Sequence, residues 1–392
     1  MKVSVNPSVA DALVPDRQAI TDLPLTIRLI PSIDDIPANQ WSELVGPNQP
    51  LWAQGVFRAM EQGSIGPSRH EYLAVSRGDR IVALLPVQQF PRLDLTGLLG
   101  FEARRKLRVV QSVLPRLFRI NAIFAGHLLG EGRLLLAEGE SQRAMFELLL
   151  PALQSLARLW RARWVVWKDM PDDVLNDTRD LLRGHGFSAI AALPDTVLDL
   201  PPGSFPDFVA ALPGKPRRNT RAKLRRLAAT KDIHIRDLSE CDTMAEQLTD
   251  LYRNVLSNAE SWLEVLTPEF FTVLCRANDV DVRIMAACRG DTPVGFLLWL
   301  AAGNRAAALR VGLNYEVSTQ AALYHNVHYR GIEAALERKC TTMDFFQTAY
   351  EPKKELGCRL VPLSNAVYYA NPFFRRLVAS ILSGTVATTT EN

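Results

Sequence analysis

A short polar stretch between residues 344 and 354 gathers the side chains best suited to chemistry. It follows an apolar, strand-like run around Met343 and carries Asp344, Gln347, Tyr350 and Lys353. A lysine on a loop at the end of a strand can hold a carboxylate, a phosphate or a developing oxyanion. Asp344 can orient Lys353 or an amine substrate. The alternatives are a solvated lysine and a carboxylate that caps the strand end.

A helix is expected upstream of this stretch, over residues 318–339, and it contributes three more polar rings. Tyr324 and His328 are four residues apart and therefore share a helix face, and His325 lies beside them. The tyrosine or a histidine can act in proton transfer. The alternative for each histidine is the helix surface or a hydrogen-bonded contact in the core.

The segment 215–226 is strongly basic and contains no acidic residue. It carries seven positive charges, among them Arg217, Arg218 and Arg221, with apolar residues spaced for helix packing. Such a cationic helix face attracts a phosphate-rich ligand: tRNA, coenzyme A, a nucleotide sugar or an anionic lipid. The alternative is a helix face that is simply solvated.

Two similar hairpins indicate an internal duplication. Residues 71–87 and residues 282–299 each read as apolar strands around an Arg-Gly-Asp turn, and a long helix and a further strand come later in each half. We therefore expect two α/β units with a proline-rich boundary near residue 195. The expected domains are 25–194 and 195–382, between disordered tails at 1–24 and 383–392. The second domain is expected to carry the site, because the first has no counterpart of the stretch 344–354.

The amino-acid composition is that of an ordinary globular protein. The 392 residues are 47% hydrophobic and 22% charged with a net charge of +3, so the chain can bury ordinary cores. We expect no signal peptide and no transmembrane segment, because no apolar run approaches the roughly 20 residues that a span needs. The five cysteines show no close pair and no metal-ligand spacing, and we interpret them as reduced thiols in a cytoplasmic protein. No metal site is expected.

The run Asp344-Phe345, a short polar loop, Lys353 and Gly357 resembles the closing motif of the FemAB-like and CelD/BcsL-type branch of the GNAT acyltransferase superfamily. That motif often reads Asp-Phe-x-x-Gly-x-x-x-Tyr-Lys-x-x-x-Gly; here Thr348 replaces the loop glycine and Pro352 precedes the lysine. The resemblance implies an α/β (α+β) fold of two tandem GNAT-like domains, each a mixed, mostly antiparallel sheet flanked by helices. The basic segment is similar to the Arg-rich helix that opens the second domain of FemAB-like proteins.

The resemblance also implies a function: an N-acyltransferase that moves an acyl group from an acyl-CoA donor to an amine. GNAT proteins hold the donor pyrophosphate where residues 311–320 lie here, with Ser318 or Thr319 expected as the helix N-cap. Members that use coenzyme A usually carry a Gly-rich loop there, which this chain lacks, and FemAB-like enzymes use aminoacyl-tRNA instead. Peptide-bond formation from aminoacyl-tRNA therefore stays open, as does a non-catalytic binding protein in polysaccharide or envelope assembly. The expected catalytic residues are Lys353, Asp344, Tyr324 and Tyr350, and the expected substrate-binding residues are Gln347, His325, His328, Ser318, Thr319, Arg217, Arg218 and Arg221.

Overall fold

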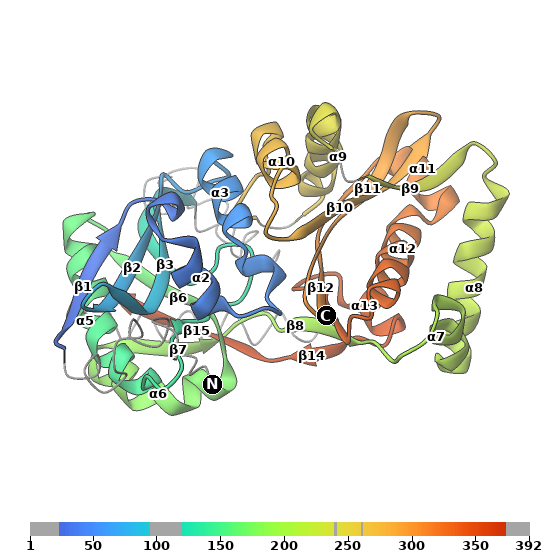
Figure 1. The fold of residues 1–392 in the computed structure, drawn as a ribbon. Coiled ribbons are helices and arrows are strands. Elements are labelled where there is room, and N and C mark those ends of the chain that lie inside the picture. The colour runs from blue at the N-terminus through green and yellow to red at the C-terminus, as the bar shows by residue number, and fades with distance from the viewer. Residues whose placement is uncertain (1–22, 95–118, 239–240, 260–261, 374–392) are drawn as a thin grey trace, which may run out of the picture.

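The computed structural model describes residues 23–94, 119–238, 241–259 and 262–373. Two sheets lie side by side, each flanked by helices (Figure 1). Within each sheet one pair of neighbouring strands is parallel, and the other neighbours are antiparallel. The predicted fold of two mixed, mostly antiparallel sheets is therefore confirmed. The tails that were expected to be disordered lie almost entirely outside the described residues.

The first sheet has eight strands and is built mainly from the N-terminal part of the chain. Its strands, in spatial order, are β1 (Leu25–Ile30), β2 (Arg69–Arg77), β3 (Arg80–Asp94), β4 (Arg119–Ala125), β6 (Trp164–Pro171), β15 (Leu363–Tyr369) and β7 (Phe187–Ala191), with β5 (Leu135–Leu136) paired to β3. The helices of this part are η2 (Ile33–Asp35), α2 (Ala38–Val45), η3 (Pro50–Trp52), α3 (Gln54–Gln62), α5 (Gln142–Leu159) and α6 (Asp172–Gly184).

The second sheet has seven strands. In spatial order they are β14 (Arg359–Val361), β8 (Asp195–Asp199), β13 (Thr342–Asp344), β12 (Arg305–Leu313), β11 (Thr292–Ala302), β10 (Asp281–Arg289) and β9 (Ile233–Leu238). The helices around it are α7 (Phe205–Ala211), α8 (Gly214–Ala229), η6 (Asp242–Met244), α9 (Ala245–Ser257), α10 (Pro268–Cys275), α11 (Tyr315–Ala321), α12 (Leu323–Glu337) and α13 (Tyr350–Glu355).

The two predicted hairpins are present and occupy matching places. They are β2–β3 and β10–β11, and each turns through a Gly-Asp pair in which the glycine, Gly78 or Gly290, has a φ of 60°. A glycine adopts this left-handed conformation without the steric cost that other residues incur. Both hairpins also shift register shortly before the turn. The repeated turn sequence thus encodes the same local structure in both sheets.

The sheets exchange one strand each. β15, near the C-terminus, lies between β6 and β7 in the first sheet. β8, which follows β7 closely in sequence, lies instead between β13 and β14 in the second sheet. The domain boundary at residue 195 stays a prediction, but the two sheets are interlocked through these strands.

The two parts of the chain also share one hydrophobic core, which runs from the first sheet to α9, α10 and the facing side of the second sheet. Helices α3 and α10 meet there, and a Cβ on Gly63 would stand 2.8 Å from the Cβ of Phe270. Polar contacts add to the packing: the Gly55 N–H donates to the Asp279 carboxylate at 3.1 Å, and the Thr267 hydroxyl donates to the Gly63 carbonyl at 2.7 Å.

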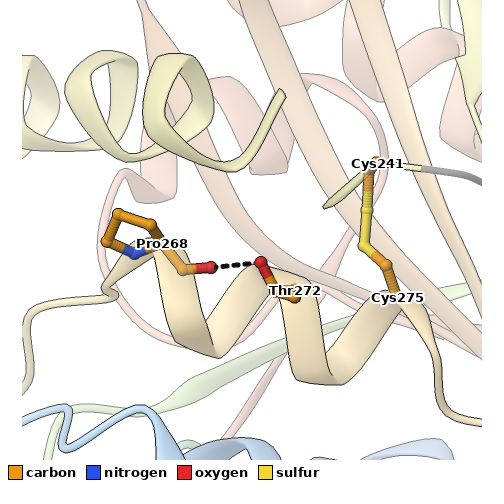
Figure 2. Close-up of a disulfide and its surroundings, with 4 residues drawn as sticks. All are labelled: Cys241, Pro268, Thr272 and Cys275. Carbon is orange, nitrogen blue, oxygen red and sulfur yellow. Dashed lines mark hydrogen bonds between the residues drawn. A yellow bond between two sulfur atoms is a disulfide. The ribbon is translucent and has the colours of Figure 1, made fainter. Parts of the chain in front are cut away.

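The expectation that all five cysteines are reduced is wrong for one pair. Cys241, just before η6, and Cys275, the last residue of α10, form a disulfide (Figure 2). They are 34 residues apart, and only the packing of α9 and α10 brings them together, so their spacing gave no signal. Cys288, Cys340 and Cys358 are free and buried. The cytoplasmic location inferred partly from the cysteines stays a prediction.

Among the described helices, none combines the length and apolar character that crossing a membrane requires.

Candidate functional site

Residues 344–354, which hold the predicted site, begin where the parallel strands β12 and β13 separate. β12 and β13 pair only between Arg305–Ala307 and Thr342–Asp344. β12 then continues to Leu313, whereas β13 ends and the chain enters residues 345–349, which we call the site loop. Polar groups at the end of a rigid strand are thereby placed where the two strands part.

The site loop has an unusual backbone. Three of its residues, none of them glycine, have positive φ: Phe346 at 55°, Thr348 at 66° and Ala349 at 47°. Each such residue costs roughly 1–2 kcal/mol relative to the right-handed region. Backbone of this kind persists only where the surroundings impose it, and it is concentrated at functional sites.

Lys353 helps to impose this shape. Its side chain is buried, with 4% of the residue exposed, and Nζ donates to the carbonyl oxygens of Phe346 at 2.9 Å and Gln347 at 2.8 Å. Burial lowers the pKa of Lys353 to about 7. The alternative of a solvated surface lysine is therefore excluded. Its contacts are those of a residue that positions the loop, and its catalytic role stays a prediction.

Asp344 pairs with Arg305 and not with Lys353. The ion pair is bidentate, with nitrogen–oxygen distances of 2.7 and 2.8 Å, and both side chains are mostly buried. This geometry fixes the carboxylate firmly, since a guanidinium and a carboxylate match in two parallel hydrogen bonds.

The side chains of Gln347 and Tyr350 form hydrogen bonds with residues outside the site loop and α13. The Gln347 side-chain amide donates to the Asp169 carboxylate and to the Leu193 carbonyl, each at 3.0 Å. The Tyr350 hydroxyl donates to the Pro194 carbonyl, also at 3.0 Å. Asp169 belongs to β6 of the first sheet, so the site loop is held in part by the other sheet.

The sequence did not identify Asp195, which lies directly beside these contacts. It is partly buried at the start of β8, and burial together with the charge of Asp169 raises its pKa to about 7. The neighbouring Thr196 accepts the Phe345 N–H at 2.8 Å and donates its hydroxyl to the Phe346 carbonyl at 2.5 Å. An aspartate after a proline at the start of a short apolar strand gave only a weak signal.

The three rings of α12 come together as predicted. The centroids of Tyr324 and His328 are 4.3 Å apart, and those of Tyr324 and His325 are 5.3 Å apart. His328 Nδ1 donates to the Tyr324 carbonyl, and its ring stacks on Phe345 of the site loop at 5.6 Å. Burial lowers the pKa of His328 to about 3 and that of His325 to about 4. Both imidazoles are therefore neutral near pH 7, and their substrate-binding roles stay predictions.

The expected N-cap is wrong. α11 begins at Tyr315, and the Asn314 side chain caps it by accepting the Glu316 N–H at 2.9 Å. Ser318 and Thr319 lie inside that helix, so neither caps the helix that follows. The expected single helix over 318–339 is divided by Ala322, whose φ of 50° separates α11 from α12. The helix-forming residues around position 322 predicted one continuous helix, but Ala322 adopts the left-handed conformation and ends α11 there.

The basic segment forms α8, which packs on α7, α11 and α12 on the side of the molecule far from the first sheet (Figure 1). Three of its basic side chains have local partners: Arg217 donates to the Ala210 carbonyl, Arg226 to the Thr319 and Gln320 carbonyls, and Lys223 pairs with Glu355 of α13 at 2.6 Å. Arg218, Arg221 and Arg225 share one exposed face and have no hydrogen bond or ion pair within the described residues. In the described residues none of the predicted arginines has a hydrogen bond or ion pair with Asp344 or the site loop, although Asn219 and Lys223 of the same helix bond to Glu355 of α13.

The predicted site residues therefore fall into groups. Asp344, Gln347 and Tyr350 lie on the side of the first sheet, the α12 rings lie on the opposite face, and Lys353 is buried beneath the loop between them. Across the described ranges, no three His, Cys, Asp or Glu side chains are arranged to hold a metal ion.

Comparisons with known proteins agree with this architecture. Residues 214–354 match the family described as "Acetyltransferase (GNAT) domain". No curated protein sequence matches the chain. Many solved structures resemble it, and three of them do so over most of both chains, at identities so low that the likeness concerns the fold alone.

The first of these is FemX, with a TM-score of 0.53 and 12% identity over 88% of this chain and 98% of that chain. The second is a tandem GNAT protein from the clavulanic acid biosynthesis pathway, with a TM-score of 0.52 and 13% identity over 88% and 99%. The third is the C-terminal domain of a putative lysylphosphatidylglycerol synthetase from Agrobacterium fabrum, with a TM-score of 0.53 and 10% identity over 89% and 96%. Residues 214–354 thus match the GNAT acetyltransferase domain family, and the described chain has a tandem GNAT-like fold.

Proposed function

We propose that this protein is an N-acyltransferase that transfers an acyl group from an acyl-CoA donor to an amine at the site loop. The observation that carries the proposal is the parting of β12 and β13 inside the matched GNAT segment. A strained loop begins where the strands part, and Lys353 and the residues before β8 hold it in place.

In this reaction the amine attacks the acyl carbonyl directly, and no covalent enzyme intermediate forms. The chain's task is to position donor and amine, to stabilise the oxyanion and to relay a proton. Asp344 and Lys353 serve by fixing the strand end and the loop. Tyr350 is the proposed hydroxyl group near the reacting atoms, with Gln347 beside it on the side of the first sheet. Tyr324, His325, His328, Ser318 and Thr319 lie on the opposite face of the second sheet, and in this proposal they contact the donor away from its reacting carbonyl.

The test is a matrix of acetyl-CoA and longer acyl-CoAs against primary amines, with release of free coenzyme A thiol as the readout. We expect saturable turnover for at least one pair, and a large loss in Lys353→Ala. Lys354→Ala is the matched control, because Lys354 is adjacent but exposed and paired with Glu351. Absence of donor binding and of thiol release across the matrix would overturn the proposal and leave a non-catalytic binding protein as the better description.

One observation favours a second candidate, the aminoacyl-tRNA-dependent formation of a peptide bond. Arg218, Arg221 and Arg225 form an exposed cationic stripe on α8 without partners in the described chain, and such a stripe suits a phosphate backbone. We expect tRNA binding that weakens steeply with salt and in the triple variant Arg218→Ala/Arg221→Ala/Arg225→Ala. The triple variant Arg158→Ala/Arg161→Ala/Arg163→Ala removes equal charge from exposed positions elsewhere and is the control. Equal effects of both variants would exclude a specific site on α8.

A further inference from the structure

The segment that joins the two sheets is fastened to the site loop and α13 at several points. We call residues 193–196 the junction segment. Its hydrogen bonds to residues 345–350 are Gln347 side chain to Leu193 O, Tyr350 hydroxyl to Pro194 O, Phe345 N–H to Thr196 O, and Thr196 hydroxyl to Phe346 O. Asp195 lies in the middle of these bonds, so its backbone is fixed relative to the loop.

The Asp195 carboxylate is left free by this arrangement. Its side chain has no hydrogen bond and no ion pair to any described residue, although it is partly buried. Val197 lies opposite Asp344 across the β8–β13 pair, and Asp195 is two residues before Val197. The side chains of Asp195 and Asp344 therefore point from the same face of the sheet. That face is turned toward the first sheet, since Gln347 reaches Asp169 of β6 there.

The charged groups around Asp195 are already paired with one another. The surrounding elements contribute Asp169 and Lys168 from β6, Glu131 from the loop after β4, Arg305 from β12, Asp344 from β13, and Tyr350 and Lys353 from α13. The nearby cations are engaged elsewhere: Arg305 holds Asp344, Lys168 holds Asp169 and two carbonyls, and Lys353 holds two carbonyls.

A partly buried carboxylate without a cation is costly unless a ligand supplies the positive charge. Burial and the charge of Asp169 raise the pKa of Asp195 to about 7. A carboxyl group of this kind is a good proton acceptor near neutral pH, because efficiency is greatest when the pKa is close to the working pH.

We propose that Asp195 binds the ammonium group of the acceptor and takes a proton from it. This inference rests on the proposed acyl transfer. The ammonium gives one proton to the Asp195 carboxylate, and the nitrogen lone pair forms the bond to the acyl carbonyl carbon. The carbon–sulfur bond then breaks with its electron pair on sulfur. The thiolate takes a second proton from the nitrogen, and Asp195 returns the first proton to solvent.

The test compares Asp195→Asn with Asp199→Asn, in the donor–amine pair that gives the highest rate. Asp199 lies on the same strand, but it is exposed and pairs with Arg359 at 3.0 Å. We expect Asp195→Asn to lower kcat/KM at pH 8 by about 10²–10⁴-fold, the range that general bases contribute, with acyl-CoA affinity unchanged by calorimetry. The wild-type kcat/KM should fall below pH 7, and this limb should be absent in the residual activity of the variant.

A second measurement does not depend on activity. The raised pKa means that the folded state keeps a proton between about pH 4 and pH 7 that the unfolded state has lost, so stability falls as pH rises through this window. Asp195→Asn removes that cost, and its melting temperature should exceed the wild-type value at pH 8 and approach it at pH 4. A difference that does not vary with pH overturns the inference.

The outcomes separate the two proposals. If wild type transfers acyl groups and Asp195→Asn keeps the same rate and the same acid limb, the role of Asp195 is wrong and the acyltransferase proposal stands. If wild type neither binds an acyl-CoA nor releases thiol with any amine, the proposed function fails and the Asp195 inference fails with it.

Discussion

At the scale of single residues, Lys353 contributes through its position beneath the site loop. We expect Lys353→Met to lower kcat/KM by about 10²-fold, because a loop displaced by about 1 Å misplaces the reacting atoms. Methionine has a similar length but cannot donate to the carbonyls of Phe346 and Gln347. Lys354→Met should leave the rate unchanged. Equal rates for wild type and Lys353→Met would show that the loop keeps its shape without the lysine.

The same lysine makes stability depend on pH. The pKa of Lys353 is lowered from 10.5 to about 7, mainly by burial, so between these values the unfolded state binds a proton that the folded state has released. The contribution of Lys353 to the free energy of unfolding therefore rises as pH increases from about 7 toward 10.5. Urea unfolding at pH 7 and pH 9.5 should show this increase in wild type and in Lys354→Met, and a smaller increase in Lys353→Met. An unchanged increase in Lys353→Met would contradict the assignment.

At the scale of one element, the site loop stores strain at Thr348. This residue has a φ of 66° and an exposed side chain without a hydrogen-bond partner in the described structure, at the position where the family motif has glycine. Thr348→Gly should stabilise the fold by up to about 1 kcal/mol, since the relief of a left-handed β-branched residue exceeds the entropy cost of glycine. Thr348→Val keeps the branching and should give no gain. Thermal unfolding of both variants checks this, and equal melting temperatures would place the strain elsewhere.

The link between η6 and α10 gives a second test at the element scale. The Cys241–Cys275 disulfide closes a loop of 34 residues, and the chain-entropy relation assigns such a loop about 3–4 kcal/mol. Cys241→Ser/Cys275→Ser should lower the free energy of unfolding by about this amount. Alkylation of the unfolded, unreduced protein should label Cys288, Cys340 and Cys358 alone. Labelling of all five cysteines would contradict the disulfide.

For the whole molecule, the sequence predicted what depends on local patterns. The Gly-Asp turns at Gly78 and Gly290 defined both hairpins, and the four-residue spacing of Tyr324 and His328 placed their rings together. The sequence did not predict the contacts between residues that are far apart in the chain. Nothing local indicates that β15 inserts between β6 and β7, or that Asp195 is surrounded by charged groups from β6, β12, β13, α13 and the loop after β4. Such contacts depend on how the two sheets pack against each other in the folded chain.

The strand exchange has a consequence for folding. β15 joins β7 to the rest of the first sheet, and its residues Ala366 and Val367 are buried. Truncation after residue 362 removes only C-terminal residues, yet we expect it to unfold the first sheet, because β7 loses its one neighbour in the described sheet and β6 loses one of its two. Truncation after residue 373 retains every described element and is the control. Residues 23–194 alone should likewise fail to fold and should regain a cooperative transition when residues 363–373 are fused to them. If the protein truncated after residue 362 melts at the same temperature as the control, β15 is not needed to complete the first sheet.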